Sequence, residues 1–233
     1  MNVDHNVFSA VDRAQLLDDA FSLFKAGLLD ETIPLTMLGY LTKEKSLVPW
    51  EVALSHLSHL NLLFRESNFR ELLKKFTRNL LGPIYDTLGW VDKGNHVDRL
   101  LRVKVIRALI EADHKDAVEK TKEMFVAFKK ENKTVPSNLR ILVFSVGIMT
   151  GNQDDWNWCY DLYTNTNIPS DRALLLSAMG DSNDIFVLQK YVLYCFVLQS
   201  VPEKSAPLRE GKSSHKGTFL LRHLVYLNFM LAG

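Results

Sequence analysis

Apolar residues recur at helical spacing along almost the whole of this 233-residue chain. In the first such segment, residues three or four positions apart repeatedly share one face, as Leu17, Phe21 and Phe24 do. No segment shows the sustained alternation of apolar and polar residues that is typical of a half-buried strand. The pattern therefore predicts an all-α protein.

Start and stop signals divide the chain into roughly ten helices. Ser9 and Asp12 have the spacing of a capping box, and Gly27 is placed to end the helix that follows. Pro49 is placed to open a helix, whereas Gly82-Pro83 is expected to interrupt one, because proline lacks the backbone donor of a helix interior. The predicted helical segments are residues 9–27, 33–41, 49–64, 69–81, 84–88, 97–111, 116–132, 139–149, 156–163, 172–179 and 183–199.

The short connections between these segments indicate a fold class. Eleven Gly and seven Pro are too few for a sandwich or barrel, which needs frequent turns. Short helices in successive antiparallel pairs instead predict a superhelical α-solenoid of the HEAT or armadillo kind. A strict sequence repeat is not visible, so the repeat is expected to be structural only.

The composition changes after residue 200. Pro, Gly, Ser and basic residues crowd between Val201 and Gly217, which predicts a flexible linker, and the chain is apolar again from Phe219 to Leu231. We therefore expect a helical domain over residues 1–200, a linker over 201–218 and an apolar terminal segment over 219–233. For that last segment, core docking or a non-native tail is favoured over a peripheral membrane anchor, and it is too short to span a bilayer.

Charge and targeting signals narrow the classes of partner. The 28 Lys and Arg against 27 Asp and Glu give a formal net charge of +1, so electrostatics gives no reason to expect nucleic acid. The first residues have neither the basic nor the apolar region of a signal peptide. Two cysteines, Cys159 and Cys195, are too few for a disulfide framework and are expected to be buried, inert thiols among aromatic residues.

Residues that could carry chemistry are few, and each has a structural interpretation. His56 and His59 are spaced three residues apart with Glu51 upstream, but the HExxH motif of zinc hydrolases is absent, so the edge of a packed helix face is favoured. The carboxylate pairs Asp18-Asp19 and Asp154-Asp155 are explained by different helix faces and by a helix N-terminus. We predict no catalytic, cofactor-binding or metal-ligating residue in this chain.

Two further motifs are present. Lys74-Lys75 and Lys129-Lys130 are too few for a nucleic-acid footprint and are interpreted as solvated helix faces. Asn132-Lys133-Thr134 is an N-glycosylation sequon in a predicted loop, which matters only if the chain is secreted.

Several segments, taken in their order and spacing, resemble the helical C-terminal domain of the zinc aminopeptidases of the membrane alanyl, glutamyl and endoplasmic-reticulum type. The resemblance covers roughly residues 8–194 and agrees with the helical pattern. It rests on the segments VDRAQLLDDAF (11–21), VPWE (48–51), PIYDTLGW (83–90), HVDRLLR (96–102), PSNLR (136–140) and LQKY (188–191).

The resemblance implies a bowl of paired helices that closes over a thermolysin-like catalytic domain and encloses the peptide-binding cavity. Peptide substrate and that catalytic domain would be partners in the full-length relative, and a homodimer is possible. Zinc would belong to the full-length relative, and a membrane would be reached only through an N-terminal anchor. The zinc, Gly-Ala-Met-Glu-Asn and oxyanion-stabilising tyrosine motifs lie upstream in the family. We therefore expect this chain to lack enzymatic activity alone.

Departures from the family pattern bear on the cellular compartment of this chain and on how much of the family's domain it contains. Ser145 and Gly180 stand where one disulfide of the vertebrate cell-surface members would fall, and no cysteine lies near Asp113, where the other would. The compartment therefore stays open between plasma membrane ectodomain, secretory pathway and cytosol. Relative to the family the chain is expected to be truncated at both ends, and residues 201–233 have no counterpart. A free-standing helical module that binds proteins or peptides is the alternative function.

Overall fold

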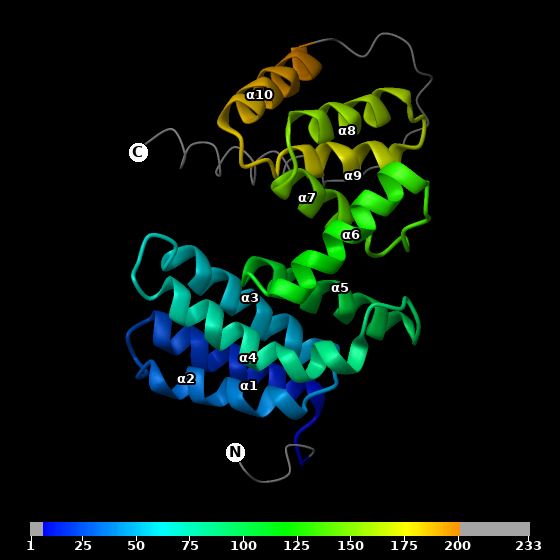
Figure 1. Ribbon diagram of the computed structural model, residues 1–233. Coiled ribbons are helices and arrows are strands. Elements are labelled where there is room, and N and C mark those ends of the chain that lie inside the picture. The colour runs from blue at the N-terminus through cyan, green and yellow to red at the C-terminus, as the bar shows by residue number, and fades with distance from the viewer. Residues whose placement is uncertain (1–6, 201–233) are drawn as a thin grey trace, which may run out of the picture. The chain divides into compact units, whose positions relative to one another are not determined.

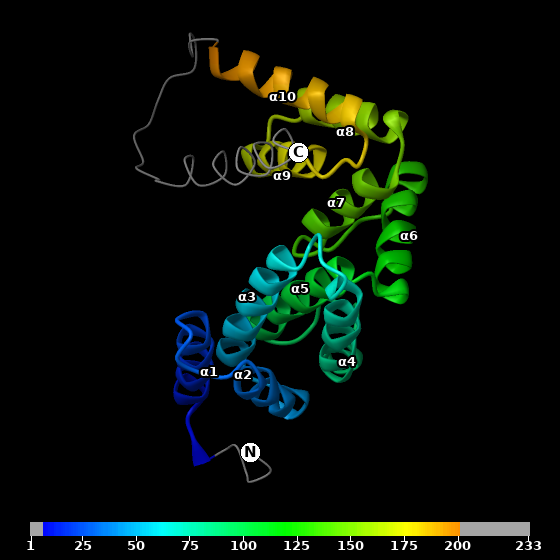
Figure 2. The same cartoon turned by 90° about the vertical axis from the view of Figure 1, so that its left-hand side faces the viewer.

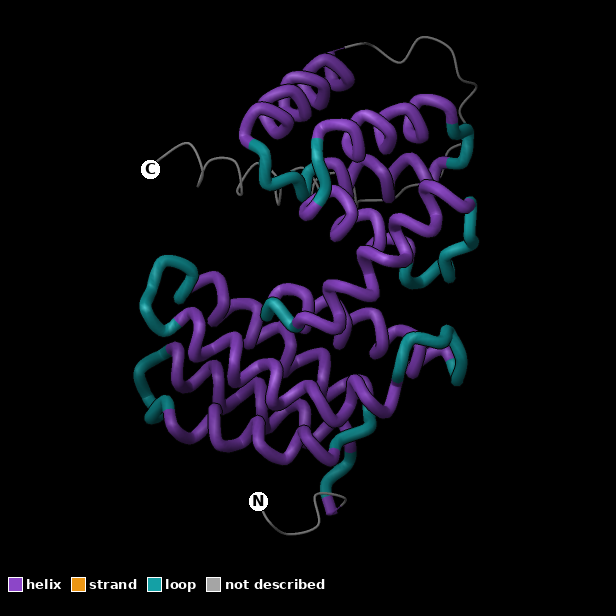
Figure 3. Tube along the Cα trace, viewed as in Figure 1, coloured by secondary structure: helices purple, strands orange, loops and turns teal. Residues whose placement is uncertain are grey.

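Helices account for most of residues 7–200, the part of the chain that the computed structural model describes (Figures 1 and 3). No strand occurs in this range, which confirms the predicted all-α class. The solenoid stacking stays a prediction, and the segments predicted at 201–218 and 219–233 lie outside the described residues. The helices are α1 (Ala10–Lys25), α2 (Thr32–Met37), η2 (Leu38–Lys43), α3 (Leu47–Leu63), α4 (Arg70–Leu88), α5 (His96–Glu111), α6 (Lys115–Glu131), α7 (Arg140–Thr150), α8 (Gln153–Asn165), α9 (Pro169–Met179) and α10 (Ile185–Ser200).

Reciprocal side-chain caps begin three of these helices. At α1 the Ser9 hydroxyl accepts the Asp12 N–H at 3.2 Å, and the Asp12 carboxylate accepts the Ser9 N–H at 3.1 Å, which confirms the predicted capping box. Each cap satisfies backbone donors that a helix end would otherwise leave unpaired. The same arrangement begins α5 and α8, with the pairs Asn95/Asp98 and Asn152/Asp155.

Helix α4 continues through Gly82 and Pro83, so the helix break predicted at that dipeptide is wrong. Pro83 has no N–H to donate to the Asn79 carbonyl, which lies four residues earlier. Pro83 and Asn79 are both exposed, so water can replace the missing donor. Ile84 and Tyr85 are buried, and their packing holds the last turns of α4 in place.

The segment predicted as one helix over residues 33–41 consists of α2 followed directly by the 3-10 helix η2. Such tighter turns are common where an α-helix finishes. In η2 they bury Leu38, Tyr40 and Leu41 while Gly39 stays exposed. The helix ends at Lys43, and the backbone becomes extended at Glu44 before α3 begins.

The chain divides into two compact units, one up to Gly147 and the other from Ile148 onward. In the first unit α3 contacts α1, α4, α5 and η2, and α5 also packs against α4 and α6 (Figure 2). Its core is formed by side chains with little or no exposure, among them Leu17, Phe21, Leu38, Leu41, Trp50, Ala53, Leu81, Leu101, Val105, Ile106 and Leu109.

In the second unit α8 packs against α9. The buried Trp156 indole donates to the Met179 carbonyl at 3.1 Å, and the Tyr191 hydroxyl of α10 donates to the Leu176 carbonyl at 2.9 Å. Both aromatic side chains thus bury their rings while satisfying their polar atoms. Although α10 is mostly apolar, neither it nor another helix within residues 7–200 has the length and apolarity needed to cross a membrane.

Gly147 of α7 allows close contact with α6, because a Cβ at this position would overlap the ring of Phe125. Phe125 is itself buried and packs edge-on against Phe144, so it has little room to move. We expect Gly147→Ala to lower the free energy of unfolding by about 1–3 kcal/mol in urea denaturation.

The matched control is Gly82→Ala in α4, where an added Cβ meets nothing within 4 Å. Because alanine has the higher helix propensity, this substitution is expected to raise the free energy of unfolding by about 0.5–1 kcal/mol. An equal effect of the two substitutions would contradict the tight packing at Gly147.

Candidate functional site

The residues nearest to a metal-binding pattern do not converge. His56 lies on α3 with its Nε2 atom 2.9 Å from Asp18 Oδ1 of α1. His59 is exposed, and Glu51 pairs with Lys104 of α5 at 3.1 Å. Within the part of the chain that the structure describes, no group of three or more His, Cys, Asp or Glu side chains is placed to hold a metal ion.

The two carboxylate pairs take structural roles. Of the first pair, one member binds His56, while Asp19 accepts a hydrogen bond from Gln15 at 2.7 Å along α1. The second pair lies in the first turn of α8, where the N–H groups of Asp154 and Asp155 donate to the Asn152 side chain. The contacts described for both pairs thus stabilise helices and their packing.

The two cysteines differ in burial. Cys159 is fully buried in α8, whereas Cys195 of α10 is partly exposed, and neither forms a disulfide. Burial raises the pKa of the Cys195 thiol, and its hydrogen bond with Tyr191 opposes that rise only in part. A thiol with a raised pKa is mostly protonated at neutral pH and therefore a poor nucleophile.

Lys74 departs from the predicted solvated helix face. Its side chain is buried, and its ammonium pairs with Asp113 in the turn between α5 and α6 and with Glu71 at 3.4 Å. The neighbouring Lys75 is exposed as predicted, and so is Lys130. Lys74 therefore fixes α4 to the α5–α6 turn.

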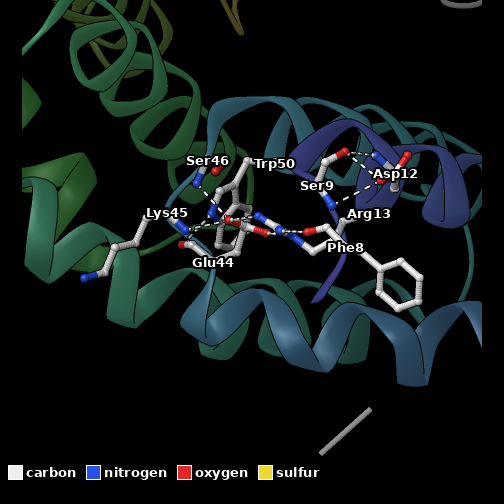
Figure 4. A network of polar contacts seen from close by, with 8 residues as sticks. All are labelled: Phe8, Ser9, Asp12, Arg13, Glu44, Lys45, Ser46 and Trp50. Atoms are coloured by element: carbon white, nitrogen blue, oxygen red, sulfur yellow. Dashed lines mark hydrogen bonds and ion pairs between the residues drawn. The ribbon is translucent and has the colours of Figure 1, made fainter. Parts of the chain in front are cut away.

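A buried ion pair joins the first turns of α1 to the connection between η2 and α3 (Figure 4). Arg13 Nε donates to Glu44 Oε2 at 2.7 Å and Arg13 Nη2 donates to Glu44 Oε1 at 3.1 Å, and the two side chains are 10% and 2% exposed. The Glu44 carboxylate also accepts the N–H groups of Lys45 and Ser46 at 2.9 Å. The Glu44 carbonyl accepts the Trp50 indole N–H at 3.1 Å.

The charges of this network are fixed near neutral pH. Burial by itself would raise the pKa of Glu44, but the hydrogen bonds from Arg13 and from two backbone N–H groups lower it below its ordinary value. Burial and the nearby Glu44 charge raise the pKa of Tyr40 to about 12, although Arg13 opposes that rise. Glu44 is thus ionised and Tyr40 neutral, which suits a structural clamp better than proton transfer at neutral pH.

A second clamp holds the loop between α4 and α5. The buried Arg102 guanidinium donates from Nε to the Gly89 carbonyl at 3.2 Å and from Nη2 to the Lys93 carbonyl at 2.8 Å. Asp92 in the same loop lies 3.7 Å from Arg102 Nη1 and accepts the Asn138 amide at 3.2 Å. Neither clamp is predictable from local sequence patterns, because the partners come from segments that are separate in the sequence.

A small cavity of about 30 Å³ lies between α3, α4 and α5. This volume holds about one or two water molecules and is too small for a peptide or an organic cofactor. Its lining includes Leu54, Leu57, Ser58, Asn61, Leu73, Lys74, Thr77, Ala108, Glu111 and Ala112.

Exposed apolar side chains are frequent around the turn between α3 and α4. Leu62, Leu63, Phe69 and Leu72, here called the α3–α4 apolar surface, are each 61–64% exposed. The Phe69 ring packs edge-on against Phe64, with 6.2 Å between the centroids. Single exposed apolar residues are ordinary, whereas contiguous apolar patches mark contact surfaces, and these four residues lie within eleven positions of the sequence.

The sequence of this chain is similar to a known domain family and to several aminopeptidases. Residues 1–208 match the family model described as the ERAP1-like C-terminal domain. Glutamyl aminopeptidase of Rattus norvegicus is 33% identical over 194 residues, which cover 82% of this chain and 20% of the relative. Aminopeptidase N of Mus musculus is 25% identical over 202 residues, which cover 83% and 21%. The chain thus spans about a fifth of the length of these relatives.

The buried ion pair makes a testable contribution to stability. Glu44→Gln keeps the size of the side chain but leaves the Arg13 cation without its counter-ion, so the free energy of unfolding is expected to fall by about 3 kcal/mol in urea at pH 7. The control is Glu71→Gln, because the Glu71 side chain is 74% exposed and the loss of its charge is expected to cost less than about 1 kcal/mol.

The same substitution has a pH signature. The pKa of Glu44 is lowered on folding, so its contribution is complete above the ordinary carboxyl value of 4.5 and is lost as the pH falls through the folded-state value. The natural chain should therefore lose more stability than Glu44→Gln when the pH is lowered below about 4.5. Parallel stability curves for the two proteins would contradict this assignment.

The His56–Asp18 contact is tested by titration. Burial lowers the pKa of His56 below its ordinary value of 6.5, and the hydrogen bond with Asp18 opposes this effect. We expect Asp18→Asn to lower the pKa of His56 further, as measured by NMR of the imidazole protons. Asp19→Asn is the matched control, since Asp19 contacts Gln15 instead, and an equal shift in both variants would refute the pairing.

Proposed function

Because this chain belongs to the ERAP1-like C-terminal domain family, we propose that it is the non-catalytic helical C-terminal domain of a zinc aminopeptidase. In this role it covers the active site of a separate catalytic domain and shapes the cavity that binds the peptide. The family match over residues 1–208 carries the proposal, and it agrees with the resemblance of the ordered sequence segments. The activity is named only in relatives about five times as long, such as the glutamyl aminopeptidases.

The pairing of charged side chains within the first unit supports a non-catalytic role. Arg13 and Glu44 neutralise each other in a buried clamp, and Lys74 is paired with Asp113. His56, the histidine nearest to a zinc-ligand pattern, contacts the carboxylate of Asp18 through its Nε2 atom. The charged residues in these contacts stabilise the helical scaffold, so the proposed reaction requires groups supplied by another domain.

The α3–α4 apolar surface supports contact with such a domain. A partner that covers Leu62, Leu63, Phe69 and Leu72 would remove apolar area from water, at roughly 25 cal/mol for each Å². The catalytic domain is a partner of this kind under the proposal. The same surface favours the second candidate function, a free-standing helical module that binds other proteins.

A complementation experiment tests the proposed function. The purified chain is added, with zinc, to a glutamyl aminopeptidase variant that lacks the segment matched by this chain, and release of N-terminal residues is followed for peptides of increasing length. We expect the chain alone to be inactive and the mixture to cleave peptides roughly tenfold faster than the truncated enzyme, a gain of ~1.4 kcal/mol in transition-state stabilisation.

The controls separate the two candidate functions. Leu62→Asp/Leu63→Asp should abolish complementation, whereas Lys75→Asp, at an exposed position of α4, should retain it. Zinc-dependent cleavage of an aminoacyl-coumarin by the chain alone would overturn the proposal. Binding of other proteins through the α3–α4 apolar surface, without an effect on the truncated aminopeptidase, would favour the free-standing module.

A further inference from the structure

The turn after α6 contains a motif that the proposed function does not use. Asn132-Lys133-Thr134 is the one Asn-X-Ser/Thr triplet with X other than Pro in the 233-residue sequence. We propose that Asn132 is an N-glycosylation site that accepts an oligosaccharide when the chain enters the lumen of a secretory pathway. This inference rests on the sequon and on the local fold, and it is independent of the proposed aminopeptidase function.

The backbone around Asn132 is compatible with a modified side chain. Asn132 ends α6 in the left-handed conformation, with φ of 53°, and its backbone N–H donates to the Ala127 carbonyl. The cap therefore depends on main-chain atoms and not on the carboxamide. The residue is exposed, and within residues 7–200 no hydrogen bond engages its side chain. A glycan on the Nδ2 atom leaves the helix end intact.

The rest of the sequon is equally accessible. Thr134 is exposed, and the residue that follows it is Val135, so proline is absent from both positions that would interfere with the acceptor sequence. Lys133 between them turns its ammonium to Glu131 at 2.7 Å. The sequon begins an eight-residue connection between α6 and α7 that contains no regular helix, which is the surface setting in which N-glycans occur.

The donor in the transfer step is an oligosaccharide linked to polyprenyl pyrophosphate. The Asn132 Nδ2 atom forms a bond to C1 of the first sugar, and the C1–O bond to the pyrophosphate breaks. The polyprenyl pyrophosphate leaves with the bonding electron pair, and one amide proton passes to a base of the transferase. No oxidant or reductant is required.

A glycan at this position has a consequence for partners of the first unit. Its bulk and its bound water keep the α6–α7 turn in solvent, so a protein partner cannot cover Asn132. The α3–α4 apolar surface belongs to a different turn and stays available for contact.

To test this proposal, the whole chain is expressed behind a cleavable signal peptide in a eukaryotic cell. Both the secreted and the intracellular protein are then analysed. We expect one mobility shift that peptide N-glycosidase F removes, with aspartate left at position 132 in the mass spectrum of the digested peptide. Thr134→Ala should abolish the shift, and Thr134→Ser should retain it, because serine preserves the sequon.

Asn132→Gln provides a second variant, which removes the acceptor asparagine of the sequon itself. A lumenal chain that shows no glycosidase-sensitive shift would overturn the proposal. A shift that persists in both Thr134→Ala and Asn132→Gln would also overturn it, because the glycan would then lie elsewhere. Neither result depends on complementation of an aminopeptidase, so this proposal and the proposed function fail separately.

Discussion

The first unit depends on the burial of α3 against several neighbours at once. Trp50, Ala53, Leu57 and Leu60 of this helix are buried, and α1, α4, α5 and η2 all contact it. An isolated helix with so much apolar surface is unstable in water, so its neighbours must each offer an apolar face. Trp50 adds a polar requirement, because a buried indole N–H needs an acceptor. The Glu44 carbonyl supplies it, and Arg13 holds Glu44 in position.

Local sequence signals predicted the helical fold well because they act within a few residues. The capping box at Ser9 and Asp12 is found as predicted, and the all-α class follows from periodicity that needs no knowledge of partners. The break expected at Gly82-Pro83 failed for a tertiary reason. Whether a helix tolerates proline depends on which side faces water, and at Pro83 the side with the missing hydrogen bond is exposed.

The polar contacts were less predictable because their partners lie far apart in the chain. Arg13 and Glu44 are 31 residues apart, His56 and Asp18 are 38 apart, and Lys74 is paired across a similar interval. Sequence patterns suggested no metal site, but they showed neither which carboxylate His56 meets nor that Lys74 is buried. One weak sequence signal for the role of Glu44 is its position just before the helix start predicted at Pro49. The unpaired N–H groups at a helix start attract a carboxylate.

The segments that carry the family resemblance contain members of these long-range contacts. Residues 11–21 include Arg13 and Asp18, and residues 48–51 include Trp50. The second clamp likewise takes Arg102 from residues 96–102 and Asn138 from residues 136–140. Some of the segments that resemble the aminopeptidase family therefore contribute residues that fix helices to one another. Under the proposed function such contacts are needed, because a surface that covers a catalytic domain keeps its form only while the helices beneath it stay in register.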